Sequence, residues 1–365
     1  MANTLGGLVL IGVEEDAENR PVLPVKGIEF KKGLSERVIS IILSNITPPF
    51  IPDVTVVSDA TKKRALVVIR IAQSHQTPHA ISGNTQVYLR TGNRNKPEDL
   101  ATIEHVAWLM DGRKKSEQFK ERLYKQAENR VKALYIENSA KQKKSDQIKN
   151  TAFPDSWIVL SMCPLFPKER LKDPPAMYQI YRDSEVDLYR GPMFPPQEGS
   201  YRTVQDGFIR QGNDGDLFHF EMNSFGLYFY KQSIAKDYPD QPRKVIWGSE
   251  IFRRLDEFIE SSIKYFLHMG YWGVLEFRAA LEAVQECMLR ATNNNSYSQV
   301  LTSPDHEVKF SAVVTAGALK EEKPRLILGA AQQIAWAFNW SLSPELLDAY
   351  YKEKRGISVL FPEKE

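Results

Sequence analysis

The sequence predicts an α/β N-terminal domain followed by an α+β C-terminal domain, and three observations lead to this fold class. The chain opens with a short apolar run, Leu8–Val13, between Gly6-Gly7 and an acidic triplet, which is typical of a buried strand. Residues 111–150 then change to a strongly basic composition. Beyond them, strand-like segments and one strongly amphipathic helix at residues 251–267 indicate a second domain.

Composition places the chain in an ordinary class. A length of 365 residues allows two or three domains, and 42% hydrophobic with 26% charged residues is usual for a globular protein. No apolar run approaches the roughly 18 residues that a membrane-spanning helix needs, so we expect no membrane partner. No signal peptide opens the chain, and Cys163 and Cys287 are predicted to be buried thiols. These features predict a cytoplasmic protein.

The N-terminal domain is predicted to alternate strands and helices. Apolar residues at helical spacing indicate a helix over 34–46, which Thr47-Pro48-Pro49 ends. Residues 65–72 are rich in β-branched side chains and are predicted to form a central strand. A strand over 85–90, a polar turn and a helix over 98–110 complete the predicted domain.

The basic segment is predicted to be a helical linker, residues 113–150, between the domains 1–112 and 151–365. Residues 111–150 hold twelve Lys or Arg and six Asp or Glu, a net charge of +6. Phe119, Leu123, Ala127, Val131 and Leu134 form one apolar stripe of a long helix. Two interpretations stay open: a solvated connecting helix, or a basic face that contacts nucleic acid.

The C-terminal domain begins with a proline-rich stretch at 164–196, which favours an extended loop. Helices are predicted near 325–340 and 344–354 as well as at 251–267, with Ser343 as the cap of the last one. Strands are predicted at 157–161, 207–211, 217–223, 227–232, 275–282 and 306–315.

No constellation typical of a catalytic site stands out, so no catalytic residue is assigned. The glycines near Gly6 lack the Gly-Lys-Ser/Thr ending of a phosphate-binding P-loop. Glu14, Glu15 and Asp16 are the candidate metal ligands, because carboxylate oxygens suit magnesium or manganese. A single acidic triplet in a loop is more often simply solvated. His75 and His79 flank a proline and are predicted to be surface residues.

Basic residues form the candidate nucleic-acid site. Arg90, Arg94 and Lys96 lie at a strand end and in a polar turn, where cations near exposed backbone amides suit phosphate oxygens. Lys114 and Lys115 extend this group at the start of the basic segment. A solvated turn is an equally good interpretation of the first three residues.

Several motifs together resemble the Schlafen AlbA_2 domain family. Residues 2–16 resemble its Ala-Asn-Thr-x-Gly-Gly…Gly-Val core. Later segments resemble the family in the same order, namely Gly27-Ile28, 45–49, 67–71, 77–79 and 88–92. The resemblance covers roughly residues 1–112 and implies a nucleic-acid-binding α/β domain, with DNA or RNA as the partner.

The resemblance also implies what this chain lacks. Some animal relatives are endoribonucleases that cut structured RNA with a carboxylate cluster. The family has a Glu-x-x-x-x-Glu-Phe-Lys segment before the Ala-Asn-Thr motif, and no such segment precedes Ala2 here. Glu29-Phe30-Lys31 looks similar but follows the first strand. We therefore expect nucleic-acid binding without nuclease activity, and we expect an upstream coding segment if the gene start is misplaced.

Two rival functions stay open. One is a metal-dependent endoribonuclease whose N-terminal carboxylate segment is missing from the sequence. The other is a ligand-sensing regulator in which the C-terminal domain carries the function. In the favoured interpretation, that domain provides homo-oligomerisation or sensing.

Overall fold

The computed structural model divides the chain into two compact units, Met1–Gln118 and Phe119–Glu365. It describes every residue except 5, 19, 62, 72–73, 75, 84–85, 90–98, 144–155, 215, 239–240, 286, 291–300 and 362–365. Side chains are also not described for 99, 137–143, 213, 214 and 216. No helix in the described part of the chain is both long and apolar enough to cross a membrane.

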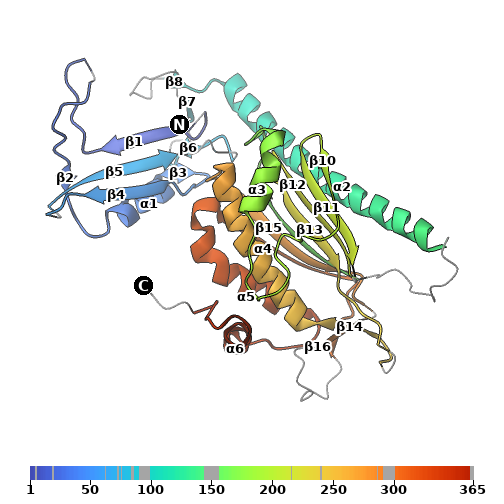
Figure 1. Ribbon diagram of the computed structural model, residues 1–365. Helices are drawn as coiled ribbons and strands as arrows, with labels where there is room; N and C mark the ends of the chain where they lie inside the picture. The colour runs from blue at the N-terminus through green and yellow to red at the C-terminus, as the bar shows by residue number, and fades with distance from the viewer. Residues whose placement is uncertain are drawn as a thin grey trace. The chain divides into compact units, whose positions relative to one another are not determined.

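The first unit is built on a small antiparallel sheet (Figure 1). The central strand β5 (Arg64–Ile71) pairs with β4 (Asp53–Ser58) along one edge. Its other edge pairs with β1 (Gly7–Ile11) and β2 (Ile28–Glu29) in turn. The helix α1 (Leu34–Asn45) ends where the Thr47-Pro48-Pro49 signal predicted. The remaining short strands are β3 (Ile46–Thr47), β6 (Ala80–Ile81), β7 (Tyr88–Leu89) and β8 (Asp99–Leu100).

The prediction that Leu8–Val13 is a buried strand is wrong in part. The strand forms, but Leu8 and Leu10 are each 55% exposed. Alternate residues of a strand point to opposite faces. Val67 and Ile69 of β5 are buried on one face of this sheet, whereas Leu8 and Leu10 point to the face on which Arg70 is exposed. The central strand predicted at 65–72 is confirmed.

A single helix, α2 (Ile103–Lys143), replaces the two helices predicted on either side of residue 112. Gly112 lies inside it, and a Cβ at this position would meet no described atom within 4 Å beyond the helix's own backbone. Glycine weakens a helix by only about 1 kcal/mol relative to alanine, so one glycine does not end a helix of this length. The predicted domain boundary at residue 112 therefore falls within continuous helix.

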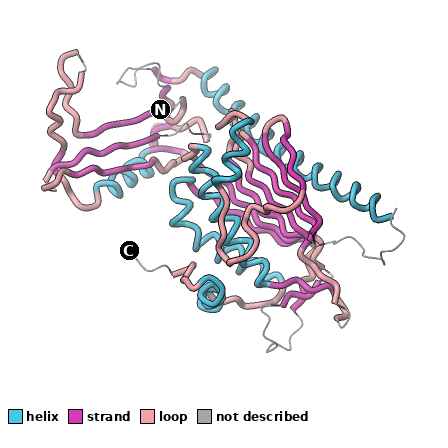
Figure 2. Tube along the Cα trace, in the orientation of Figure 1, coloured by secondary structure: helices cyan, strands magenta, loops and turns pink. Residues whose placement is uncertain are grey.

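The second unit is built on a seven-stranded antiparallel sheet in the order β10-β11-β12-β13-β9-β15-β18 (Figure 2). Its strands are β9 (Trp157–Pro164), β10 (Ser200–Val204), β11 (Gly207–Asp214), β12 (Asp216–Asn223), β13 (Tyr228–Ser233), β15 (Val274–Glu282) and β18 (Glu307–Thr315). Except for β10, each lies where the sequence predicted a strand. A smaller sheet joins β14 (Lys244–Trp247), β16 (Cys287–Arg290) and β17 (Leu301–Thr302).

Helices cover both faces of the large sheet. The helices of one face are α3 (Met177–Asp183), α4 (Gly248–Met269) and α5 (Leu319–Ala337), and α6 (Pro344–Arg355) packs on α4. The part of α2 from Phe119 onward packs on the other face. The helix α3 corrects the prediction of an extended loop over 164–196. The predicted cap of α6 is confirmed, because the Ser343 hydroxyl accepts a hydrogen bond from the Leu346 amide.

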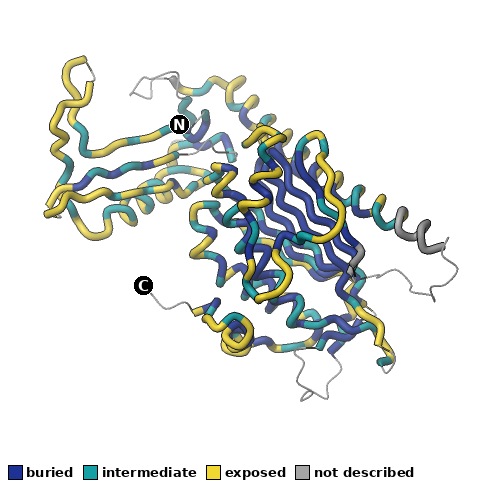
Figure 3. The backbone as a smooth tube through the Cα atoms, viewed as in Figure 1, coloured by how far each residue is buried: buried dark blue, intermediate teal, exposed yellow. Residues whose placement is uncertain are grey.

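The main core of the second unit lies between the sheet and α3–α6 (Figure 3). Ile158, Leu160 and Met162 of β9 point into it, because alternate residues of this central strand share a face. From α4, Leu255, Phe258 and Ile259 are fully buried, as the amphipathic pattern predicted. Leu267 is an exception to that pattern and is 57% exposed. Cys163 and Cys287 are both buried thiols, as predicted.

Candidate nucleic-acid interface

The motif Ala2-Asn3-Thr4 holds the first unit together around its N-terminus. The Asn3 side-chain amide donates to the His79 carbonyl over 2.9 Å and to the Tyr88 carbonyl over 3.0 Å. Its oxygen accepts a hydrogen bond of 2.7 Å from the His79 amide. Asn3 is buried, so these bonds satisfy both ends of its amide away from water. The asparagine therefore fixes the strand β7, whose next residue in the chain is Arg90.

His79 is buried, which corrects the prediction of a surface histidine. Its ring nitrogens contact the Pro48 carbonyl, over 2.7 Å, and the Ser74 hydroxyl. Burial lowers the pKa of His79 and outweighs the hydrogen bond to Pro48, which acts in the opposite direction. The neutral imidazole ring thus connects the loops of Pro48 and Ser74 through hydrogen bonds. His75 lies outside the described residues.

Two glycines of the motif segments allow close packing beside β5. Gly12 and Gly27 both have positive φ, of +106° and +68°. A Cβ on Gly27 would lie 2.9 Å from the Ala65 carbonyl oxygen, which is closer than real Cβ atoms approach. Only glycine adopts this backbone without strain while lying so near to another strand. These glycines therefore have a structural role beside β5.

The acidic triplet lies in the hairpin that follows β1, and all three side chains are exposed. Glu14 forms an ion pair of 2.8 Å with Lys26. The Asp16 carboxylate accepts hydrogen bonds of 2.9 Å from the amides of Glu18 and Arg20, which is a local turn. Glu15 lies in an isolated bridge with Pro21. Within the described residues, no group of three or more His, Cys, Asp or Glu side chains is arranged to hold a metal ion.

The predicted basic residues divide into two sets. Arg90, Arg94 and Lys96 lie outside the described residues. Lys114 and Lys115 lie on α2 and are exposed, opposite the buried residues Leu109 and Ser116. Lys115 pairs with Asp111 one turn earlier, at 2.7 Å and largely in solvent. Lys114 has no ion-pair partner among the residues that the structure describes. Exposed pairs of this kind are weak, so both ammonium groups are accessible to phosphate.

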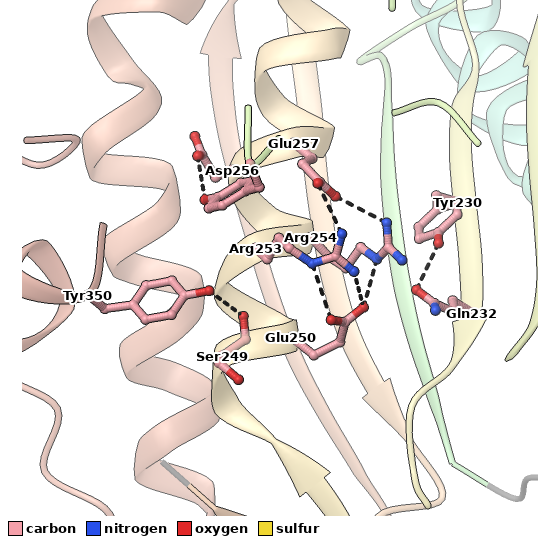
Figure 4. Close-up of polar contacts among 10 residues, drawn as sticks. Tyr230, Gln232, Ser249, Glu250, Arg253, Arg254, Asp256, Glu257 and Tyr350 are labelled. Atoms are coloured by element: carbon pink, nitrogen blue, oxygen red, sulfur yellow. Dashed lines mark hydrogen bonds and ion pairs between the residues drawn. The ribbon is translucent and has the colours of Figure 1, made fainter. Parts of the chain in front are cut away.

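Sequence reasoning missed a cluster of charges on α4, which Figure 4 shows. Glu250 and Glu257 each pair with both Arg253 and Arg254, at N–O distances between 2.6 and 3.2 Å. Burial raises the pKa of Glu257 despite the two guanidinium groups, whereas for Glu250 the same guanidinium groups outweigh burial and lower the pKa. The sequence pattern that could have predicted this cluster is the spacing Glu-x-x-Arg-Arg-x-x-Glu, which places the four residues on adjacent helical turns.

This cluster is not a free binding site. Two carboxylates balance two guanidinium groups, so no net charge is left for a ligand to neutralise. Arg254 also lies over the Tyr230 ring, at 5.6 Å from its centroid. The cluster thus ties α4 to β13.

Comparison with known proteins supports one part of the chain. Residues 1–99 match the family model described as "Schlafen, AlbA_2", which confirms the resemblance inferred from the sequence. The matched residues lie entirely within the first compact unit. Searches of curated proteins and of solved structures found no match. The similarity to the Schlafen AlbA_2 family therefore extends over residues 1–99 of the chain.

Proposed function

We propose that this chain, with its N-terminal Schlafen AlbA_2 domain, binds nucleic acid through a basic surface of the first unit. Arg90, Arg94 and Lys96 follow the strand that Asn3 fixes, and Lys114 and Lys115 add two cations on α2. The accessible lysines on α2 carry the proposal, together with the family match. Phosphate contacts by Lys and Arg supply most of the affinity in such complexes and make it salt-dependent.

The proposal is tested by fluorescence anisotropy with labelled tRNA, duplex DNA and single strands over a salt series. We expect measurable affinity for at least one of the three, falling linearly with salt on logarithmic axes. The Lys114→Ala, Lys115→Ala variant should bind more weakly and show a salt slope flatter by about two units. A variant of two exposed lysines of the second unit, Lys309→Ala and Lys354→Ala, is the matched control. Equal affinities for both variants and the wild-type chain would refute the proposal.

We further propose that the chain binds without cutting. Metal-assisted cleavage needs carboxylates that fix an ion beside the phosphate so that it activates water. Glu14 and Asp16 are engaged by Lys26 and by backbone amides, and magnesium gives up its water reluctantly to exposed ligands. Residual binding of magnesium or manganese by Glu14, Glu15 and Asp16 should be weak.

The rival is a metal-dependent endoribonuclease. Incubation of labelled tRNA and ribosomal RNA with magnesium or manganese distinguishes the two. We expect no cleavage above that of the Glu14→Ala, Glu15→Ala, Asp16→Ala variant. Robust cleavage that vanishes in this variant would establish the nuclease instead. Oligomerisation or sensing by the second unit, and a cytoplasmic location, stay predictions.

A further inference from the structure

The two faces of the seven-stranded sheet differ in chemistry. One face packs apolar and aromatic side chains against α3–α6. The other face carries charged and polar side chains on its central strands, although a helix covers it. We call this second face the polar face, and the α2 residues 119–136 that cover it the strap. The polar face includes His219, Glu221, Lys231, Glu276, Arg278 and Glu282.

Four charged residues of the strap meet opposite charges on the polar face. Lys120 pairs with Glu276 at 2.8 Å, and Glu121 pairs with Arg278 at 2.8 Å. About two to three turns further on, Glu128 pairs with Lys231 at 2.8 Å, and Arg130 pairs with Glu221. The order of signs along the strap is thus plus, minus, minus, plus, and the sheet presents the complementary order.

Charged side chains of the polar face also pair with other residues of the same face. Lys231 also contacts Glu282 at 2.6 Å, and Arg278 contacts Glu276 at 2.9 Å. His219 lies between the Gln211 amide, at 2.9 Å, and Glu221, at 3.2 Å. These partners would remain with the sheet if the strap left. If the strap left, water would therefore hydrate these charges. Leaving charges buried and unpaired would cost much more free energy, and this does not occur here.

The apolar part of this contact is small. Leu123, Tyr124, Ala127 and Val131 pack on Cys163, Leu227 and Phe229, with a few half-buried residues beside them. Interfaces between separate domains or proteins are more polar than the core of a single domain. The contact between strap and sheet has this more polar composition, because ion pairs flank its small apolar centre.

The strap's own charges differ in exposure. Lys120 is buried, whereas the side chains of Glu121, Glu128 and Arg130 are 60%, 29% and 33% exposed. Salt screens exposed charges far more than buried ones. The pairs that Glu121, Glu128 and Arg130 form should therefore weaken as salt rises, while the pair of Lys120 weakens least.

We propose that the strap is a releasable clasp, and that the polar face is a docking surface for a helix with the charge order of the strap. In the wild-type chain its occupant is the chain's own α2, which blocks the surface. Release exposes a strip that combines the aromatic ring of Phe229 with the charges of Lys231 and Glu221. The inference does not depend on nucleic-acid binding.

The first test reverses the strap's charges in the full chain with Lys120→Glu, Glu128→Lys and Arg130→Glu. A labelled helix-stapled peptide with the wild-type sequence of residues 117–136 is the probe. We expect the peptide to bind the variant about tenfold or more tightly than it binds the wild-type chain, because reversed charges weaken the internal contact. A peptide that carries the same three reversals is the matched control and should not bind the variant. Equal binding of the wild-type peptide to both chains would overturn the proposal.

The second test uses the wild-type chain and so does not depend on the variant folding. Amide hydrogen exchange is followed from about 0.05 M to about 1 M salt, over which screening shortens from beyond 10 Å to about 3 Å. We expect the amides of residues 127–136 to exchange faster with salt, while those of α4 stay unchanged. Exchange of the strap and α4 at equal, salt-independent rates would contradict a releasable clasp.

Discussion

The two compact units bury their side chains to very different extents. The second unit has a continuous core that includes fully buried aromatic residues such as Tyr228, Tyr265 and Phe258. Among the described residues of the first unit, the buried apolar ones are few, namely Ala2, Ala65, Val67, Ile69 and Leu109. The helix α1 has no fully buried residue. The first unit therefore depends on a few apolar side chains and on specific hydrogen bonds, and it leaves much of its surface available for binding.

Truncation of a central core residue should have the largest effect. Phe258→Ala should lower the free energy of unfolding of the second unit by about 3–5 kcal/mol, because a fully buried ring is lost and a cavity remains. Urea unfolding measures this loss. On the same helix, Leu267→Ala should change stability by less than about 0.5 kcal/mol, since that side chain is mostly exposed. Equal losses would show that the core is assigned to the wrong face of α4.

The corresponding change in the first unit should be smaller. Ile69→Ala, in the central strand β5, should cost about 2–3 kcal/mol, at the lower end for such truncations because the small core can collapse around the gap. Leu10→Ala lies on the open face and should be nearly neutral. Thermal unfolding, monitored by hydrogen exchange of the β5 amides, measures the stability of this unit. A larger loss of unfolding free energy for Ile69→Ala than for Phe258→Ala would contradict the smaller core of the first unit.

A polar contact should be almost as important in this unit. Asn3→Ala removes a buried amide and leaves the carbonyls of His79 and Tyr88 and the His79 amide without their partner. We expect a loss of about 1–3 kcal/mol, as is usual for buried groups left unsatisfied. Exchange of the amides around β7 should rise most. Unchanged protection of β7 in the variant would show that Asn3 does not fix this strand.

The smallest expected effect is the pH dependence of hydrogen-exchange protection in the strap. Burial acts to raise the pKa of Glu276, but Lys120 from the strap and Arg278 from its own strand outweigh it and hold the pKa below the ordinary value of 4.5. This contribution to stability is complete above the ordinary value and is lost as the pH falls below it. Protection of the strap, corrected for intrinsic exchange, should therefore decrease in acid. Glu276→Gln should weaken that dependence, and an identical pH profile for both chains would contradict the assignment.

Strong local patterns predicted much of the fold. The period of α4, the Ser343 cap of α6 and the alternation in β15 each define their element from neighbouring residues. The continuity of α2 was not predicted, because the change of composition at residue 111 suggested a boundary. Local signals do not show whether a helix continues through such a point.

Long-range features could not be predicted in the same way. His219 and Glu221 lie on the face of β12 opposite to the apolar residues Phe218 and Phe220. They are buried because α2, which lies about a hundred residues earlier, covers that face. The motif Ala-Asn-Thr identified a family, but the partners of Asn3 lie more than seventy residues away. Of the predicted basic site, the structure describes Lys114 and Lys115 and not the turn at 90–96.

The most direct test of the account is the salt dependence of nucleic-acid affinity in the Arg90→Ala, Arg94→Ala variant. If these arginines hold phosphates, affinity falls and the slope of log affinity against log salt flattens by about one unit for each lost contact. Stability should stay unchanged, because neither arginine is predicted to contribute to a core. Wild-type affinity together with a wild-type slope in this variant would contradict the proposed basic surface.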